Sequence, residues 1–360
     1  MTTNTILIII QRSNGDVFLS ASLIQNLQQS FQPDAIDLLV NDDTLPIAQT
    51  LPFIRQIHTF SYHKKKENKW KQEKEIIKKI YRKYDLSINL TASDRSVIYA
   101  LLASKKAISA VEENNIKSWW KKILLKFHYN FEVKKHILLN NLKPLQLLDI
   151  EVSNQQPLPK YSNSAAISIK NRLNKLNVTQ FIIFHPSAQY YYKIYSTKLR
   201  DELLVLLDQL NVPIIVTGGF NEIDKKIKES LPKLDNIIDF IGETTIEEYI
   251  ALSELSQGYI GMDTLNMHIA AAQNKRIFAI FGPTNLNMWS PWSNKLELSA
   301  KENKPLQTYG NVTVFQAEMP CVACGNKGCN NNGVISECLS NISPIVIFKE
   351  IEEWLLNKAL

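Results

Sequence analysis

The feature of this sequence that most constrains its fold is a repeated alternation between short apolar runs and segments with helical periodicity. The run at 5–10 precedes a segment, 17–31, in which apolar residues recur every three or four positions, and further short runs come at 35–40 and 86–90. Short β-branched or aromatic runs between amphipathic segments predict strands joined by helices, which form parallel sheets. Because the alternation restarts at 181–187, the sequence predicts an α/β protein with two Rossmann-like domains.

The stretch between the two halves, 151–166, is polar, contains prolines and shows no periodicity, which is typical of an interdomain linker. A chain of 360 residues is long enough for two domains of ordinary size. Residues 117–149 are predicted to be helical and basic. The predicted parts are an N-terminal domain at 1–155, a linker at 156–178, a C-terminal domain at 179–345 with a cysteine-rich loop at 321–338, and a C-terminal helix at 346–360.

The positive charge of the chain is concentrated in its first half. Residues 1–160 contain 23 Lys and Arg against 15 Asp and Glu, a charge of +8, whereas the remainder contains 18 against 20, a charge of −2. Each basic run, at 63–83 and 117–127, could be a solvated helix face, but the asymmetry indicates an acidic partner for the first domain. Nucleic acid, anionic lipid and a phosphorylated glycan are the candidates. Trp119 and Trp120 beside lysines favour a membrane interface, and the sequence contains no identifiable nucleic-acid recognition module.

Membrane-spanning and secretory segments are not expected. No apolar run approaches the roughly 20 residues that a spanning helix requires. The run at 6–10 lacks a basic leader and is too short for a signal-peptide core. We therefore expect a cytoplasmic protein whose basic N-terminal domain contacts a membrane only peripherally.

In open α/β sheets ligands bind beyond the carboxyl ends of the strands, so candidate residues are sought in the loops there. In the first half, Asn14, Gly15 and Asp16 directly follow the first strand. Asp16 could cap the helix expected to begin at Val17. It could instead be a carboxylate base that projects into a cleft between the domains, with Gly15 allowing close approach. The residues alone favour the cap.

The second half places polar residues at several strand ends. Ser187 and Lys193 follow one strand, Gly218, Gly219 and Glu222 follow the next, and Asp263 with Thr264 opens a later helix, with Thr284 at a further strand end. Gly-Gly loops and helix N-termini bind phosphates through backbone N–H groups, a lysine adds charge for a diphosphate, and an acid accepts hydrogen bonds from ribose hydroxyls. The absence of GxGxxG and Walker motifs argues against NAD dehydrogenases and P-loop ATPases.

His268 lies five residues after Asp263, one turn into the helix. A lone histidine there is more often a packed, hydrogen-bonded core residue than a catalyst, but its place near the predicted phosphate site favours contact with the ligand.

The four cysteines form a single cluster, C-x2-C-x4-C-x8-C, at Cys321, Cys324, Cys329 and Cys338. Four thiolates at this spacing could hold a structural zinc or iron ion. A chance group of free thiols is the alternative, and disulfides are not expected in a reducing cytoplasm.

Three segments resemble the heptosyltransferase family, glycosyltransferase family 9. Residues 12–40 are similar to its opening Gly-Asp strand–helix unit, and 185–196 resemble its His-Pro loop with a following lysine. Residues 261–292 resemble its most specific signature, Asp-Thr-Gly-x-x-His-x-x-Ala-Ala followed by Phe-Gly-Pro-Thr.

The resemblance implies a GT-B fold, with two Rossmann-like domains facing an interdomain cleft, and inverting transfer of a heptose from ADP-heptose to an inner-core lipopolysaccharide acceptor. Such an enzyme would work at the cytoplasmic face of the inner membrane of a Gram-negative bacterium, with no cofactor needed for catalysis, which fits the lack of an Asp-x-Asp motif near these loops. The resemblance makes Asp16 the catalytic base rather than a cap. The implied donor-binding residues are Ser187, Lys193, Glu222, Thr244, Asp263, Thr264 and His268, and the implied acceptor-binding residues are Arg12 and Gly15.

The chain departs from the family pattern at two places. Leu265, followed by Asn266, stands where the signature has glycine, and Tyr190–Tyr192 precede Lys193. These departures leave open the alternative that this chain is a relative that uses another nucleotide sugar or glycosylates a protein, as autotransporter heptosyltransferases do. A nucleotide-sugar binding module without catalysis is a further alternative.

Overall fold

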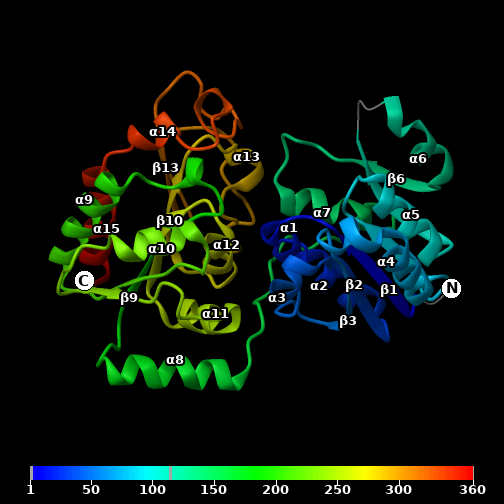
Figure 1. The fold of residues 1–360 in the computed structure, drawn as a ribbon, viewed down its shortest axis with the longest axis horizontal. Coiled ribbons are helices and arrows are strands. Elements are labelled where there is room, and N and C mark those ends of the chain that lie inside the picture. Colours follow the sequence, from blue (N-terminus) through cyan, green and yellow to red (C-terminus); the bar gives the residue numbers. More distant parts are fainter. Residues whose placement is uncertain (1–2, 113–115, 360) are drawn as a thin grey trace. The chain divides into compact units, whose positions relative to one another are not determined.

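The computed structural model describes residues 3–112 and 116–359. The chain forms two compact units, residues 1–160 and 161–360. Figure 1 shows that each contains a twisted sheet with helices on both faces. We describe each unit by itself.

The first unit contains a six-stranded parallel sheet with the order β3-β2-β1-β4-β5-β6. Its strands are β1 (Thr5–Ile10), β2 (Ala35–Asn41), β3 (Ile54–Phe60), β4 (Leu86–Asn89), β5 (Lys106–Val111) and β6 (Phe127–Asn130). Ile8 of β1 lies opposite Leu38 of β2 and Ile88 of β4. This is the strand order of Rossmann domains, and it reverses direction between β1 and β4, where ligands of such sheets bind.

Helices cover both faces of this sheet. They are α1 (Asn14–Phe18), α2 (Ala21–Phe31), α3 (Leu45–Ala48), α4 (Lys64–Ile80), α5 (Asp94–Ala103), α6 (Trp119–Leu124) and α7 (Ile137–Gln146), with short 3₁₀ turns η1 (Asp42–Thr44) and η2 (Ile116–Ser118). Leu7, Ile80, Val97 and Leu125 belong to one buried cluster, which joins α4, α5 and the end of α6 to β1. These three helical elements therefore pack on the same face of the sheet.

The prediction of a helical segment at 117–149 is wrong in part. Residues 127–130 form β6, which pairs in parallel with β5 and places Phe127 opposite Ile108. Four residues are too few to show a strand period within a basic segment, so pairing with β5 decides their conformation.

The second unit contains a seven-stranded sheet with the order β12-β13-β11-β10-β7-β8-β9, in which β12 runs antiparallel to β13 and the other pairs are parallel. Its strands are β7 (Ile182–His185), β8 (Ile214–Val216), β9 (Ile237–Asp239), β10 (Gly258–Met262), β11 (Arg276–Phe281), β12 (Leu306–Tyr309) and β13 (Val312–Gln316). Apart from β12, the order repeats that of the first unit, with the reversal between β7 and β10.

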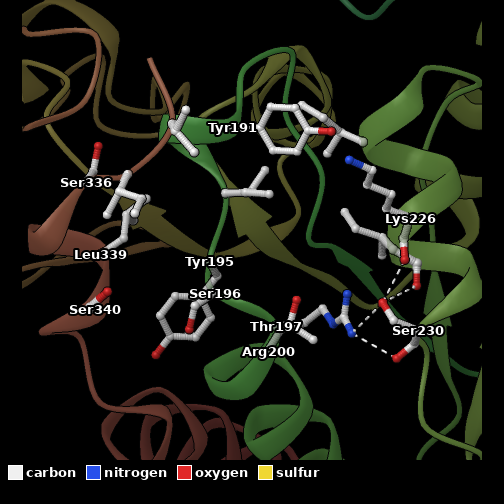
Figure 2. A pocket seen from close by; sticks show the side chains of 15 residues that line it. Tyr191, Tyr195, Ser196, Thr197, Arg200, Lys226, Ser230, Ser336, Leu339 and Ser340 are labelled. Carbon is white, nitrogen blue, oxygen red and sulfur yellow. Dashed lines mark hydrogen bonds between the residues drawn. The ribbon is translucent and has the colours of Figure 1, made fainter. Parts of the chain in front are cut away.

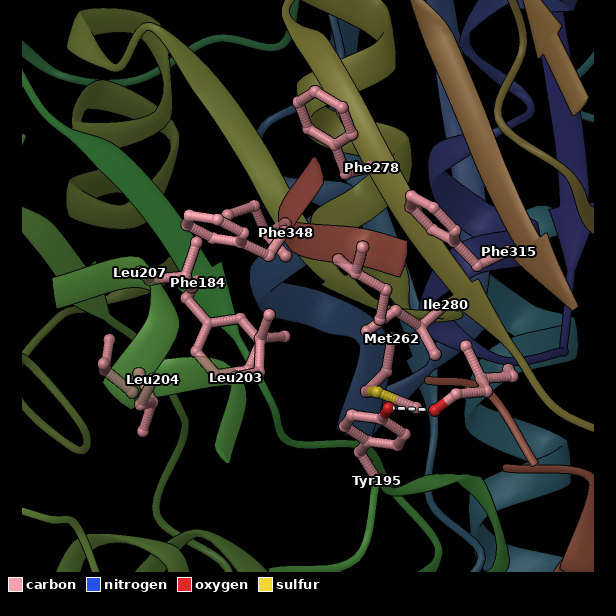
Figure 3. Packing of buried hydrophobic residues seen from close by; sticks show 14 of the residues in the cluster. Phe184, Tyr195, Leu203, Leu204, Leu207, Met262, Phe278, Ile280, Phe315 and Phe348 are labelled. Atoms are coloured by element: carbon pink, nitrogen blue, oxygen red, sulfur yellow. Dashed lines mark hydrogen bonds between the residues drawn. The ribbon is translucent and has the colours of Figure 1, made fainter. Parts of the chain in front are cut away.

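The helices of the second unit are α8 (Asn163–Lys175), α9 (Thr197–Leu207), α10 (Glu222–Glu229), α11 (Ile246–Leu255), α12 (Leu265–Ala272), α13 (Leu286–Trp289), α14 (Glu337–Ser340) and α15 (Pro344–Ala359), with 3₁₀ turns η3 (Tyr191–Lys193), η4 (Asp208–Leu210) and η5 (Cys329–Asn331). Figure 3 shows the core on one face of the sheet, where Phe184 and Phe315 of the strands lie near Leu203 of α9 and Phe348 of α15. Each fully buried side chain of this size contributes about 1.5–3 kcal/mol.

The predicted linker at 156–178 contains α8, a helix that the polar composition of 151–166 did not indicate. The Ser162 hydroxyl accepts from Ala165 N as its N-cap, and Ser168 Oγ donates to Glu248 of α11 at 2.7 Å. Because α8 packs on α11, the division between the compact units falls after Lys160.

Candidate functional site

The candidate base of the first unit lies at the carboxyl end of β1. Asp16 is buried inside the short helix α1, which begins at Asn14, so Asp16 is not the cap of a helix that starts at Val17. Arg12 Nε lies 2.8 Å from Asp16 Oδ1, and Ser13 Oγ donates to Oδ2 at 2.6 Å. These two contacts fix the orientation of the carboxylate.

The two predicted acceptor-binding residues lie beside this carboxylate. The Arg12 guanidinium is 5.3 Å from the centre of the Phe131 ring, which holds its stem in place. A Cβ added at Gly15 would meet no atom of the described residues within 4 Å. Packing within the unit therefore does not require glycine at this position, and the space above it is open.

The candidate donor residues of the second unit gather where its strand order reverses, between β7 and β10. Lys193, on the loop after β7, donates to Asp263 Oδ2, directly after β10, at 2.8 Å. Burial lowers the pKa of Lys193, but the charge of Asp263 and their hydrogen bond outweigh it and raise that pKa above its usual value. The structure thus keeps an ammonium group at the edge of the sheet.

Asp263 and Thr264 lie at the N-terminus of α12, as expected from the sequence. Thr264 occupies the N-cap position, but within residues 3–112 and 116–359 its hydroxyl accepts no hydrogen bond from the backbone of α12. Its nearest polar partner is the Tyr259 hydroxyl at 3.4 Å. The first N–H groups of α12 therefore have no side-chain cap, which is the arrangement that binds anions at helix N-termini.

His268 is buried one turn into α12. Burial lowers its pKa to about 4, the charge of Asp263 partly opposes that shift, and Lys193 adds to it. Its Nδ1 has no hydrogen-bond partner among the residues that the structure describes. His268 is thus a neutral imidazole close to the Lys193–Asp263 pair, and not the satisfied core histidine that the residue type alone favours.

The structure adds residues that the sequence analysis did not single out. His185, at the end of β7, lies 3.0 Å through Nδ1 from Thr217 Oγ1, and Asn266 Nδ2 lies 3.0 Å from the same nitrogen. Burial lowers the pKa of His185 to about 4. This network links β7, β8 and α12. In the sequence, the signal was the position of Asn266 directly after Leu265, the residue that departs from the family signature.

The remaining predicted donor residues show no such convergence. Ser187 is buried after β7, and Thr244 is half-buried before α11. Glu222 opens α10 on the surface, where its carboxylate lies 3.0 Å from Lys225 Nζ. The geometry therefore groups Lys193, Asp263, Thr264 and His268, while Glu222 stands apart with a partner of its own.

The Gly218–Gly219 loop has a packing reason of its own. A Cβ at Gly218 would lie 2.9 Å from Asp224 Oδ1, and one at Gly219 would lie 3.1 Å from Asp224 Oδ2. Asp224 is buried because it completes the capping box of α10 with Asn221. Close packing against Asp224 is thus one reason for glycine at both positions, and a role for this loop in binding phosphate stays a prediction.

The segment that carries Lys193 is held by the cysteine-rich loop. Ser336 Oγ donates to Tyr192 O at 2.6 Å. Gly328 has φ +83°, and a Cβ there would lie 3.2 Å from Tyr192 Cβ and 2.6 Å from Asn332 Oδ1. The rings of Tyr190 and Tyr192 stack with centroids 5.4 Å apart. Loop 321–338 thus supports the backbone next to Lys193.

Tyr191 also forms one wall of a pocket of about 270 Å³. Figure 2 shows Arg200 of α9 in this pocket, donating to Ser230 O at 3.0 Å and Ser230 Oγ at 3.1 Å. Arg200 also pairs with Asp201, so its charge is already neutralised. Lys193 does not line the pocket, which is therefore separate from the candidate donor site.

The predicted metal site at the four cysteines is not supported. In residues 3–112 and 116–359, no group of three or more His, Cys, Asp or Glu side chains is placed to hold a metal ion. Cys321 and Cys324 are exposed, whereas Cys338 is buried in the core, and burial, with a smaller contribution from the other three cysteines, raises the pKa of its thiol to about 11.

No helix in the described part of the chain is both long and apolar enough to cross a bilayer.

Comparisons with known proteins agree with this architecture. The family model of glycosyltransferase family 9 (heptosyltransferase) matches residues 74–317. The sequence is 25% identical over 292 residues to lipopolysaccharide heptosyltransferase 3 of Escherichia coli, an alignment that covers 79% of this chain and 85% of that protein.

Two solved structures share the fold. A glycosyl transferase family 9 protein from Veillonella parvula DSM 2008 gives a TM-score of 0.79 at 16% identity, over 99% of this chain and 98% of that one. The ADP-heptose lipopolysaccharide heptosyltransferase II of E. coli gives 0.73 at 18% identity, over 99% and 100%.

Two Rossmann-like units, each with candidate residues where its strand order reverses, define an α/β enzyme of the GT-B class, as the sequence predicted. Since the family model matches more than half of the chain, this protein belongs to glycosyltransferase family 9, the heptosyltransferase family, and is a glycosyltransferase.

Proposed function

We propose that this enzyme transfers a heptose from ADP-heptose to the inner core of lipopolysaccharide, with inversion at the anomeric carbon. The observation that carries the proposal is the pair of half-buried Lys193 and buried Asp263 at the uncapped N-terminus of α12. A lysine and a helix N-terminus are the groups that stabilise a departing diphosphate without a metal ion. The names of the E. coli relatives supply the donor and the acceptor class.

In the proposed reaction, an acceptor hydroxyl attacks the anomeric carbon on the face opposite to the diphosphate. A C–O bond forms to the acceptor oxygen, and the C–O bond to the β-phosphate breaks with its electron pair, releasing ADP. The hydroxyl proton passes to Asp16, whose carboxylate is oriented by Arg12 and Ser13. Sugar transfer of this type develops oxocarbenium character, and a general base typically contributes about 10²–10⁴-fold to the rate.

The proposed donor contacts are divided among the loops of the second unit. Lys193 and the N–H groups of α12 bind the diphosphate, and Thr264, at the N-cap position, lies beside those N–H groups. His268, which is neutral above about pH 4, is available as a hydrogen-bonding group beside the phosphates without adding charge. Ser187, Glu222 and Thr244 are proposed to contact the nucleoside, and Glu222 would exchange Lys225 for a ribose hydroxyl.

On the acceptor side, Arg12 and the open space above Gly15 receive the anionic glycan. The charge of +8 on residues 1–160 suits a phosphorylated acceptor held at a membrane, and we place the enzyme at the cytoplasmic face of the inner membrane of a Gram-negative bacterium. Nucleic acid is not a proposed partner.

A second candidate function rests on Asn266, which contacts His185 at the base of the donor site. A family member with glycine one position earlier lacks the Leu265 side chain directly before this contact. A relative that takes another nucleotide sugar, or a protein acceptor, is therefore the alternative.

The test begins with thermal unfolding of the full chain in ADP, UDP, GDP and CMP at equal concentrations, for the wild type and Lys193→Ala. A ligand at about 100 times its Kd stabilises the fold by about 2.7 kcal/mol. We expect stabilisation by ADP, reduced in the variant, followed by transfer from ADP-heptose to a delipidated core oligosaccharide. A preference for another nucleotide would reject ADP-heptose as the donor. Transfer to a polypeptide would favour the alternative of a protein acceptor.

A further inference from the structure

One short segment of the first unit presents several exposed apolar side chains close together in the sequence. Ile116 of η2 is 90% exposed, and in α6 Trp119 is 65%, Ile123 70% and Leu124 60% exposed. Trp119 and Ile123 are four residues apart and so share one face of the helix. Figure 1 shows α6 at the outer edge of the unit. Large apolar side chains grouped in this way mark an interaction surface rather than scattered exposure.

The opposite side of the same segment is firmly attached to the unit. Trp120 packs against the cluster that contains Leu125, which is itself buried. Lys121 is buried too, and its Nζ donates to Ala92 O at 2.5 Å and lies 2.9 Å from Asp94 Oδ1. These anchors fix which residues face outward. Of the two adjacent tryptophans, Trp120 faces inward and Trp119 is presented to solvent.

Basic side chains border this apolar surface. Lys122 and Lys126 are exposed and alternate with the apolar residues. The helix α4 packs on the same face of the sheet, and it presents Trp70, 82% exposed, together with further lysines. In 70–80, the part of α4 whose side chains the structure describes, the exposed lysines are Lys71, Lys74, Lys78 and Lys79. Among the side chains of α4 and α6 that the structure describes, Glu75 is the exposed acid, and Asp94 at the start of α5 is paired with Lys121, so the described exposed charge of these two helices is positive.

We propose that Ile116, Trp119, Lys122, Ile123, Leu124 and Lys126, here called the α6 surface, dock the enzyme on an anionic lipid bilayer. A tryptophan, aliphatic side chains and flanking lysines are the composition of interfacial helices, in which apolar groups enter the headgroup region and ammonium groups bind anionic lipids. A second copy of this chain is less suited to bind this surface, because its own α6 lysines would face Lys122 and Lys126. The inference rests on the proposed function in one respect, that the acceptor is anchored in a lipid bilayer. The α6 surface itself contains no residue of the proposed donor site.

Co-sedimentation with vesicles tests this surface, using phosphatidylcholine alone and phosphatidylcholine with phosphatidylglycerol, without donor or acceptor. We expect binding to the anionic vesicles that falls as salt rises. Trp119→Ala and Ile123→Ser should each weaken it by about ten-fold, and Lys122→Glu by at least the roughly five-fold that one lysine contributes near an anionic surface. The matched controls in the second unit, Ile167→Ser on α8 and Lys301→Glu, should bind like the wild type. Unfolding curves confirm that the exposed-site variants remain folded.

Two further readouts separate the outcomes. Transfer to the delipidated oligosaccharide should be unchanged in Trp119→Ala, so loss of vesicle binding with that activity retained supports docking apart from catalysis. Vesicle binding with no transfer at all would reject the proposed function but keep the docking surface. Equal vesicle binding by Trp119→Ala and wild type would overturn the proposal. So would a wild-type dimer that Trp119→Ala converts to a monomer, since a second copy would then occupy the surface.

Discussion

The two units of this enzyme share one strand order but place different chemistry where that order reverses. In the first unit the reversal carries a carboxylate, Asp16, held by Arg12 and Ser13 within a short helix. In the second it carries an ammonium group, Lys193, paired with Asp263 at an uncapped helix N-terminus. The same topology thus presents a carboxylate in one unit, our proposed proton acceptor, and an ammonium group in the other, at our proposed anion site. Fold alone does not decide function, because the side chains at strand ends do.

The surfaces of the units differ as well. Residues 1–160 carry a charge of +8 and the exposed apolar face of α6, whereas the remaining residues carry −2. The division between an acceptor unit and a donor unit can therefore be tested one unit at a time.

The largest effect is expected at Asp16. Asp16→Asn keeps the shape of the side chain and removes the proposed base, so kcat for heptose transfer should fall about 10²–10⁴-fold. Stabilisation by ADP should be unchanged, because the variant leaves the second unit intact. Asp43→Asn, an exposed acid after β2, is the control and should retain activity. An unchanged kcat in Asp16→Asn would show that Asp16 is not the catalytic base.

The next prediction concerns acid stability. His268 has a pKa of about 4 in the folded protein and about 6.5 when unfolded, so between these values the unfolded chain binds more protons. Stability should therefore be full above about pH 6.5 and fall as the pH drops toward 4, by about 3 kcal/mol for this histidine. Urea unfolding from pH 4 to 8 should show a shallower pH dependence in His268→Gln than in the wild type. Equal slopes would show that His268 is not buried as a neutral group.

Lys193 separates donor binding from the chemical step. Lys193→Ala removes the charge proposed to meet the diphosphate and leaves the carboxylate of Asp263 without its ammonium partner. We expect ADP to bind about 10–100-fold more weakly by calorimetry, consistent with the loss of one or two charged contacts. Lys226→Ala removes a lysine 5.2 Å from the Tyr191 ring and serves as the matched control. If both variants bind ADP like the wild type, the donor site lies elsewhere.

The smallest effect should come from the loop that supports Lys193. Ser336→Ala removes the hydrogen bond to Tyr192 O, which is worth about 1 kcal/mol, so KM for the donor should rise about five-fold while kcat changes little. Ser340→Ala, on α14 nearby, should leave KM unchanged, and Ser336→Thr should restore most of the affinity. A general loss of stability without a change in KM would show that loop 321–338 has only a structural role.

Much of the architecture could be predicted from the sequence because the signals are local. Runs such as 6–10 and 277–281 are apolar and continuous, as is typical of strands buried on both faces. The positions of Asp16, Lys193 and Asp263 after strands were enough to place them at carboxyl ends of strands. The short strand β6 was missed, and α8 was assigned to a linker, because pairing with β5 and packing on α11 decide those segments rather than local composition.

Side-chain partners are what the sequence alone did not determine. It showed a Gly-Gly loop but not the Asp224 carboxylate beside it, four cysteines at a metal-like spacing but not the burial of Cys338 among apolar residues, and two adjacent tryptophans but not which one faces solvent. Spacing along the chain fixes which residues share an element or its end. Distances between elements depend on how the sheets twist and the helices pack, and only the tertiary structure decides those.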